Sequence, residues 1–156
     1  MSTRLKEGNV RKLVLLLAAG AVAALAIASM SAARPAMPIT LHATLTAASE
    51  VPKQTVKNIS AKGSFTGTLT GTKLKWKLTF SLLTGPATAA HIHLGAVGKS
   101  GNVVVALCGP CHSGQRGTAT ISASLLKKIE RHLTYVNVHT KKNPNGEIRG
   151  QLVAKM

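Results

Sequence analysis

The sequence predicts an all-β domain, an antiparallel Greek-key sandwich or barrel of about eight short strands with one short helix, preceded by a signal peptide. Apolar and polar residues alternate with a period of two through most of the chain after residue 33. This period is typical of strands that turn one face toward a core. Glycine, proline and asparagine turns separate these stretches, and only one stretch has apolar residues at helical spacing. Short strands joined by such turns favour a sandwich or barrel.

The amino-terminal segment has the composition of an export signal. Residues 1–33 begin with four basic residues, continue through an apolar run at 13–27 and end in small residues at 28–33. This order predicts a signal peptide cut near residue 33. The alternative is an uncleaved anchor, because a membrane-spanning helix needs about 17–25 residues and the apolar segment approaches that length. Residues 34–38 are then a short leader, and the domain occupies 39–154.

Two stretches show the strand pattern most clearly. Residues 39–46 and 73–80 alternate strictly, and the second carries three lysines on its polar side. A Gly71-Thr72 turn signal makes 62–80 a predicted hairpin. Further strands are expected at Ala89–Leu94, Val103–Leu107, Thr118–Ser122, Tyr135–His139 and Glu147–Val153, with a turn at Asn143–Gly146 before the last.

One helix and one long loop complete the expected architecture. Apolar residues within 125–133 recur at helical spacing, and Ser124 is the expected N-cap of a short helix packed on the sheet. Residues 47–60 are polar and are expected to form a loop.

The expected mature chain is strongly basic. Residues 34–156 contain sixteen Lys and Arg against three Glu, a formal charge of +13. Such a charge favours an anionic polymer or a cell-envelope surface as partner, alongside a protein ligand. Nucleic acid is disfavoured, because stacking on single strands needs several exposed rings and the aromatic residues are few. A membrane is expected as a partner only if the signal segment stays uncleaved.

The histidines are the strongest candidate site. His91 and His93 are two apart and therefore share one face of a strand, while Asn137 and His139 share a face of another. If the intervening apolar residues line the core, the histidines lie on outward faces. Three imidazoles from two strands are a ligand set suited to copper or zinc. The alternative is a polar hydrogen-bond network that includes Asn137 and Tyr135.

The stretch Cys108-Gly-Pro-Cys111-His112 matches several motifs at once. It has the spacing of a thioredoxin-like redox pair and of covalent haem attachment. A thioredoxin-like site needs a helix directly after the first cysteine, and a glycine-rich link stands there instead. Haem would need a distal ligand, and the only methionines after residue 33 lie near the termini. In an exported domain, a disulfide between Cys108 and Cys111 is the favoured interpretation, ahead of a free redox pair, a soft-metal site or haem.

Four stretches together resemble the CHRD domain, a module named for its repeats in chordin and also found singly in secreted bacterial proteins. They are Ala90-His-Ile-His-Leu-Gly95, Asn102-Val-Val-Val, Tyr135-Val-Asn-Val-His-Thr140 and Asn143-Pro-Asn-Gly-Glu-Ile-Arg-Gly-Gln-Leu152. The resemblance covers roughly residues 40–154. It implies a binding or structural module with no reaction attached and with an unidentified ligand.

The His-Ile-His segment is also similar to the copper/zinc superoxide dismutase family. That resemblance implies His91, His93 and His139 as copper ligands, with His112 as a fourth. The chain contains no Asp, which that family uses at its zinc site, so only a copper site is implied. The favoured expectation is a domain without a cofactor. The alternative is a copper-binding metalloprotein similar to superoxide dismutase.

We therefore expect an exported, non-enzymatic binding or structural module. Glu147 and Arg149 share a face of the last expected strand, and a cross-strand ion-pair arrangement is favoured over a catalytic role for them. Three acids spread along the mature chain leave little material for hydrolase chemistry. A thiol-disulfide oxidoreductase at the CGPC motif is the second alternative. The predicted polar site consists of His91, His93, Asn137, His139, Glu147 and Arg149.

Overall fold

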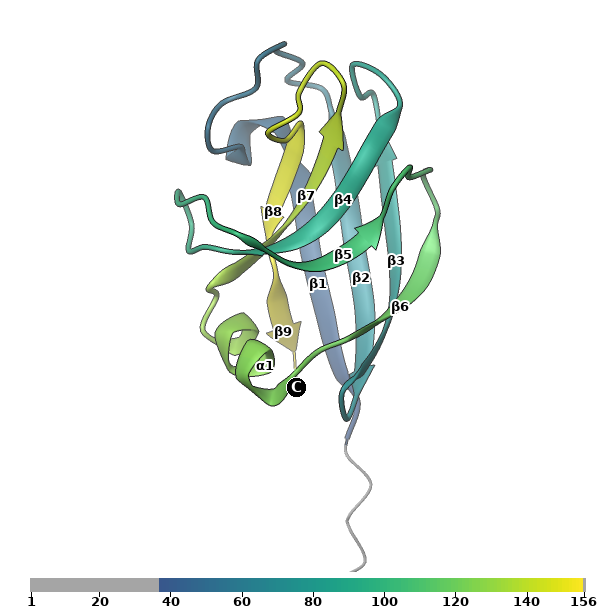
Figure 1. The fold of residues 1–156 in the computed structure, drawn as a ribbon, viewed down its shortest axis with the longest axis vertical. Helices are drawn as coiled ribbons and strands as arrows, with labels where there is room; N and C mark the ends of the chain where they lie inside the picture. Colours follow the sequence, from purple (N-terminus) through teal and green to yellow (C-terminus); the bar gives the residue numbers. More distant parts are fainter. Residues whose placement is uncertain (1–36, 156) are drawn as a thin grey trace, which may run out of the picture. The chain divides into compact units, whose positions relative to one another are not determined.

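A computed structural model describes residues 37–155, which form one domain of strands with a single α-helix (Figure 1). The predicted signal peptide and most of the leader lie outside the described residues. The elements are β1 (Ile39–Thr46), a 3-10 turn η1 (Ala47–Ser49), β2 (Lys62–Thr70), β3 (Lys73–Ser81), β4 (Ala87–Leu94), β5 (Val103–Cys108), β6 (Arg116–Thr120), α1 (Ala123–Glu130), β7 (Thr134–Thr140), β8 (Ile148–Gln151) and β9 (Val153–Lys155).

The strands form one antiparallel sheet in the order β5-β4-β7-β8-β1-β2-β3-β6, with β9 also paired to β1. Neighbours such as β4 and β7, or β3 and β6, are far apart in the chain, as a Greek-key arrangement requires. The two strands that end this order, β5 and β6, lie close to each other, so the sheet curls until it is nearly closed (Figure 1). The predicted all-β fold class is confirmed.

The core is made by the inward face of the curled sheet. In β2 and β3 the buried positions alternate with exposed ones, and Phe65, Leu69, Leu74 and Leu78 are almost completely buried. Full burial of one such side chain stabilises the fold by about 2 kcal/mol. The helix α1 adds Leu125 and Ile129 to this core.

The helix begins two residues earlier than expected. Ser122, not Ser124, is the N-cap, because its backbone is extended and its Oγ accepts a hydrogen bond from the Leu125 N–H at 3.2 Å. Ser124 lies inside the first turn, where its hydroxyl pairs with that of Ser122. Within residues 37–155, no helix is long and apolar enough to cross a membrane.

The last expected strand is interrupted. Residues 148–151 pair with β7, whereas 153–155 pair with β1. Between them the Leu152 N–H donates to the Thr134 carbonyl at 3.0 Å and the Leu152 side chain is buried. Glu147 precedes β8 rather than belonging to it.

Candidate metal centre

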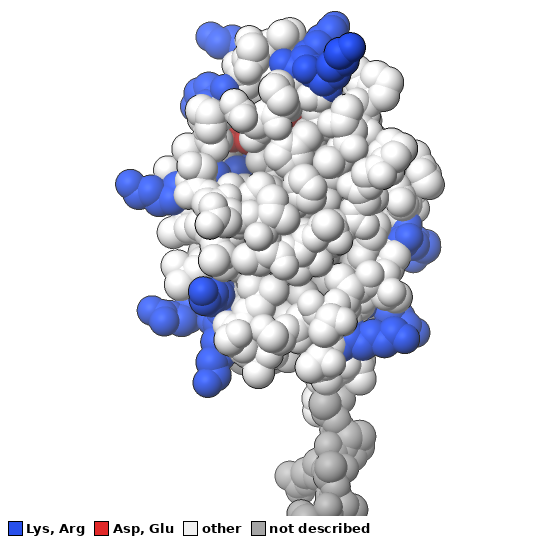
Figure 2. Space-filling model, in the orientation of Figure 1, with Lys and Arg blue, Asp and Glu red and all other residues white. Residues whose placement is uncertain are grey.

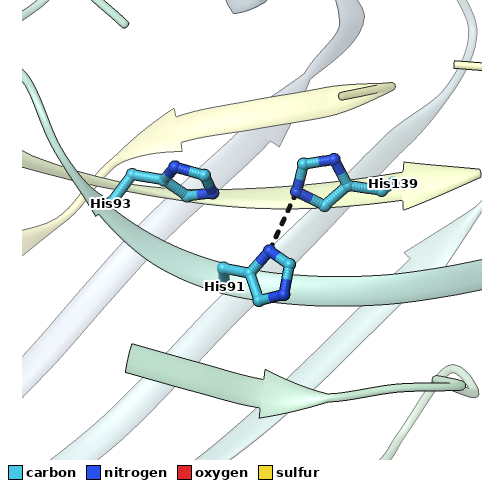
Figure 3. Close-up of side chains that lie close together, drawn as sticks. All are labelled: His91, His93 and His139. Atoms are coloured by element: carbon cyan, nitrogen blue, oxygen red, sulfur yellow. Dashed lines mark hydrogen bonds between the residues drawn. The ribbon is translucent and has the colours of Figure 1, made fainter. Parts of the chain in front are cut away.

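Strands β4 and β7 bring three histidines together. His91 pairs in register with Asn137, and Ala89 pairs with His139. Because side chains alternate along a strand, His91, His93 and His139 lie on the face opposite Ile92 and Val138, which are buried in the core. Figure 3 shows the three rings directed toward one another from these two strands. The structure thus brings together three of the four residues predicted as metal ligands.

The three histidines lie on the outward face of the sheet, as predicted, but two of them are shielded from solvent. His93 and His139 are 8% and 9% exposed, and only His91 is partly open to solvent. The cause is the loops that fold over this face. The loop between β4 and β5 places the Gly101 carbonyl 2.9 Å from His93 Nδ1, and the loop after β7 places the Pro144 carbonyl 3.0 Å from His139 Nδ1.

These loop carbonyls determine which nitrogens carry protons. A carbonyl oxygen can only accept, so Nδ1 of His93 and Nδ1 of His139 must each carry a hydrogen and donate it. In a neutral imidazole the other nitrogen then bears a lone pair. His93 Nε2 is buried without a hydrogen-bond partner, and His139 Nε2 lies 3.1 Å from His91 Nδ1. The ligand atoms of the three residues all lie within 4.8 Å of one another.

The three imidazoles are held neutral. Burial lowers the pKa of all three, most strongly for His139, where it falls to about 4 against the opposing hydrogen bond to Pro144. The neighbouring histidines lower the pKa of His91 and His139 further, because two imidazolium charges at this distance repel. Neutral imidazole is the form that coordinates a metal ion.

An aromatic stack supports the centre on one side. The Tyr135 ring stacks on His93 with the centroids 4.9 Å apart, and the Arg149 guanidinium carbon lies 3.4 Å from the Tyr135 centroid. Arg149 donates to the carbonyls of Ala96 and Lys99 at 3.2 and 2.6 Å. Arg149 therefore ties the loop after β4, which also carries Gly101, to β8, and its stack on Tyr135 extends this link to β7.

Glu147 and Arg149 do not form the expected ion pair with each other. Arg149 bonds the loop carbonyls, whereas the Glu147 carboxylate accepts from the hydroxyls of Thr84 and Thr140 at 2.7 and 2.6 Å. Burial alone would raise the pKa of Glu147, but these hydrogen bonds outweigh it and lower that pKa. Glu147 lies before β8, not on it, so the two side chains are directed into different loops.

Glu50 is a buried residue of this region that the sequence pattern did not single out. It is completely buried, and its Oε2 lies 3.4 Å from Asn137 Nδ2. Burial raises the pKa of Glu50 to about 8, in spite of the opposing charge of Arg149. Its Oε1, like Asn137 Oδ1 and Arg149 Nη1, is buried without a hydrogen-bond partner. Glu50 lies in a segment with the composition of an ordinary polar loop. Only the small number of acidic residues in the sequence could have drawn attention to it.

The cysteines lie away from the histidine centre, in the connection between β5 and β6. Cys108 ends β5, and it is disulfide-bonded to Cys111 with the Cα atoms 5.4 Å apart. The residues after Cys111 lead directly into β6, so the CGPC motif is followed by a strand and not by the helix that a thioredoxin-like site needs. His112 is exposed and hydrogen-bonds through its backbone to Gln115. It is not among the three converging imidazoles.

A nearly closed antiparallel sheet with a polar cluster under its loops defines an all-β domain. The model of the CHRD domain family matches residues 41–152, and the chain belongs to that family. Searches of the curated proteins and of the solved structures found no match.

Proposed function

We propose that this CHRD domain is a metal-binding module in which His91, His93 and His139 hold a copper ion. The observation that carries the proposal is the convergence of three ligand nitrogens within 4.8 Å. Metal–nitrogen bonds of about 2.0 Å place the ligand atoms of a three- or four-coordinate site about 3.3–3.5 Å apart. The His91–His139 separation of 3.1 Å is close to that spacing, so a small ring movement would complete the site.

The hydrogen bonds around the rings support a defined ligand set. Metal-bound histidines usually donate their second ring N–H to a carbonyl or carboxylate, which fixes the tautomer and the ring orientation. His93 and His139 already make such bonds through Nδ1, which leaves a lone pair on Nε2 of each; His93 Nε2 has no partner, and His139 Nε2 accepts from His91 Nδ1. His91 would coordinate through Nδ1 after its proton moves to Nε2, on the more open side of the cluster. The ligand set is then one Nδ1 and two Nε2 atoms.

The chemistry of the ligands favours copper among the transition metals. All three donors are imidazoles, which suit copper and zinc, and divalent copper binds nitrogen ligands more tightly than its first-row neighbours. No carboxylate belongs to the cluster that converges within the described residues, so hard cations such as magnesium or calcium are poorly matched. Zinc is the competitor that the experiment must include.

The test is a metal titration of the purified protein with copper and with zinc, followed by electron paramagnetic resonance of the copper form. We expect one copper per chain and a spectrum with nitrogen couplings. His93→Ala and His139→Ala should each weaken copper binding by about 100-fold or more. His42→Ala is the matched control, because His42 is a partly buried histidine on β1 outside the cluster.

Copper binding that is equal in the His93→Ala, His139→Ala and His42→Ala proteins would refute the proposal. Far-ultraviolet circular dichroism and thermal melting of each variant distinguish loss of a ligand from loss of the fold. Tighter binding of zinc than of copper at this site would refute the choice of metal.

We also propose that the protein is exported. The Cys108–Cys111 disulfide supports this, because such bonds persist mainly in oxidising compartments outside the cytoplasm. Amino-terminal sequencing of the protein recovered from expressing cells tests it. A start near Arg34 is expected, and a chain that retains residues 1–33 in the cytoplasmic fraction would contradict it.

A further inference from the structure

The four strands at the end of the sheet away from the histidine cluster contain no acidic residue. β1, β2, β3 and β6 are hydrogen-bonded neighbours, and none of them contains Asp or Glu. Their outward positions are mostly threonine and lysine. We call the outward side chains of these four strands the lysine–threonine face.

The strand register arranges this face in rows. In one row Lys75 pairs with Thr68 on one side and Thr118 on the other. In the next row Lys77 pairs with Thr66 and with Arg116. A shallow cleft of about 220 Å³ crosses both rows, and the polar side chains that line it are Thr40, Thr66, Thr68, Lys75, Lys77 and Arg116.

The arrangement opposes the stability of the sheet. Lys77 and Arg116 lie directly opposite each other on an antiparallel pair, with their Cα atoms about 5 Å apart. Like charges in this position destabilise a sheet, and Lys75 adds a third cation about 7 Å away along β3. Features that reduce local stability are often found at functional sites. An anion in the cleft would remove this repulsion.

Few carboxylates of the chain itself are exposed and able to pair with these cations. Glu50 and Glu147 are completely buried, which leaves Glu130 on α1 as the exposed acid among residues 37–155. Figure 2 shows lysine and arginine side chains around the rim of the visible face, with only a trace of acidic surface. A polyanion would therefore meet an almost uniformly positive field as it approaches.

We propose that the lysine–threonine face binds an acidic polysaccharide. The cations would pair with its carboxylates, and the threonine hydroxyls between them would hydrogen-bond its sugar hydroxyls. An extended chain suits a face built from straight, exposed strands. The large exposed apolar residues of the described chain all lie outside these four strands, so the face lacks the apolar side chains that insert into a lipid surface. Trp76 is the aromatic residue among those that line the cleft, and it is only 5% exposed, so the cleft offers little ring surface on which nucleic-acid bases could stack.

The test is binding of the purified protein to polygalacturonate, measured by calorimetry or by retention on an immobilised column at about 0.1 M salt. Lys75→Glu/Lys77→Glu should weaken binding by tenfold or more. Lys141→Glu/Lys142→Glu is the matched control, because it changes the net charge by the same amount at two exposed lysines outside the face. We expect the control to weaken binding less than threefold. Equal weakening by the two variants would overturn the proposal, because binding would then follow net charge alone.

Two further measurements separate the partner classes. Neutral dextran should not bind, and single-stranded DNA or vesicles of anionic phospholipid should bind more weakly than polygalacturonate at the same salt. Tighter binding of DNA or vesicles, lost in Lys75→Glu/Lys77→Glu, would overturn the choice of polysaccharide. His139→Ala should bind polygalacturonate like the unaltered protein, because the histidine centre lies on other strands. The failure of one proposal is therefore distinguishable from the failure of the other.

Discussion

Strands β7 and β3 are similar in length but differ in what surrounds them. Every residue of β7 is buried, because β4 and β8 flank it and loops cover its polar face. In β3 buried positions alternate with exposed or partly exposed ones, and its lysines stay in solvent. Burial lowers the pKa of His139 on β7, so its side chain is neutral. The lysine side chains of β3 are in contact with water and keep their charge. The same alternating sequence pattern therefore produces a buried histidine cluster in one place and a charged surface in the other.

The difference has an energetic reason. A buried polar group costs about 1–3 kcal/mol unless it finds a hydrogen-bond partner, and His139 of β7 finds one in the Pro144 carbonyl. Lysines on β3 need no partner, because water solvates them. Substitutions should consequently have large effects on β7 and small ones on β3.

The largest effect is expected from a lysine placed on β7. Asn137→Lys would bury an ammonium group where Asn137 is now 1% exposed, and it should lower the free energy of unfolding by about 3 kcal/mol or more. Thr44→Lys, at an exposed position of β1, should change it by less than about 0.5 kcal/mol. Urea unfolding followed by circular dichroism measures both. Equal effects would contradict the contrast between the two regions.

The second effect is a pH dependence centred on Glu50. Its pKa is raised from 4.5 to about 8 in the folded protein, so the folded state holds a proton that the unfolded state releases. The contribution to stability is greatest below pH 4.5 and is lost as the pH rises toward 8, on the order of 5 kcal/mol in total. The charged groups that act on Glu50 are Arg149, which opposes the shift, and Glu147, which adds to it.

Glu50→Gln isolates this contribution. The stability of the unaltered protein relative to Glu50→Gln should fall between pH 5 and pH 8, as measured by urea unfolding at several pH values. A difference between the two proteins that stays constant over this range would show that Glu50 does not hold its proton on folding.

The third effect concerns the connection between the end strands β5 and β6. Reduction of the Cys108–Cys111 disulfide should destabilise the domain by about 2 kcal/mol, because the bond restricts the unfolded chain. Thermal melting with and without a reductant measures this. Cys108→Ala/Cys111→Ala should melt at the temperature of the reduced protein and should be insensitive to reductant. A reductant effect on that variant would point to another cause.

The smallest effect is expected on the lysine–threonine face and has the opposite sign. Lys77→Thr removes the like-charge pair with Arg116 and should raise the free energy of unfolding by about 0.5 kcal/mol at low salt. The gain should disappear at about 1 M salt, where charges several ångströms apart are screened. A gain that persists at high salt would show that strand propensity, and not charge, is responsible.

Most of the fold could be predicted from local pattern. The alternation in 39–46 and 73–80 determines which face of each strand is apolar, and β1 and β3 contain these residues. The errors are at boundaries. Ser122 and Ser124 are equally good caps in sequence, and the choice between them depends on how α1 packs through Leu125 and Ile129. The break at Leu152 depends on pairing with two different strands.

The candidate site was only partly predictable. The spacing of His91, His93 and His139 places their side chains on one face of paired strands, and the structure confirms that they converge. Their burial depends on Gly101 and Pro144, which belong to loops whose course is set by tertiary contacts. No periodic pattern reports such contacts.

By itself the sequence determined the strand periodicity, the basic charge, the cysteine spacing and the shared face of the histidines, because each is a property of residues close together in the chain. Only the tertiary structure decided that β7 lies between β4 and β8, that two loops close over its histidines, and that Glu50 enters the same region from a distant loop. Burial and the resulting pKa shifts are set by neighbours in space, and two such neighbours, Glu50 and Asn137, are 87 positions apart in the chain.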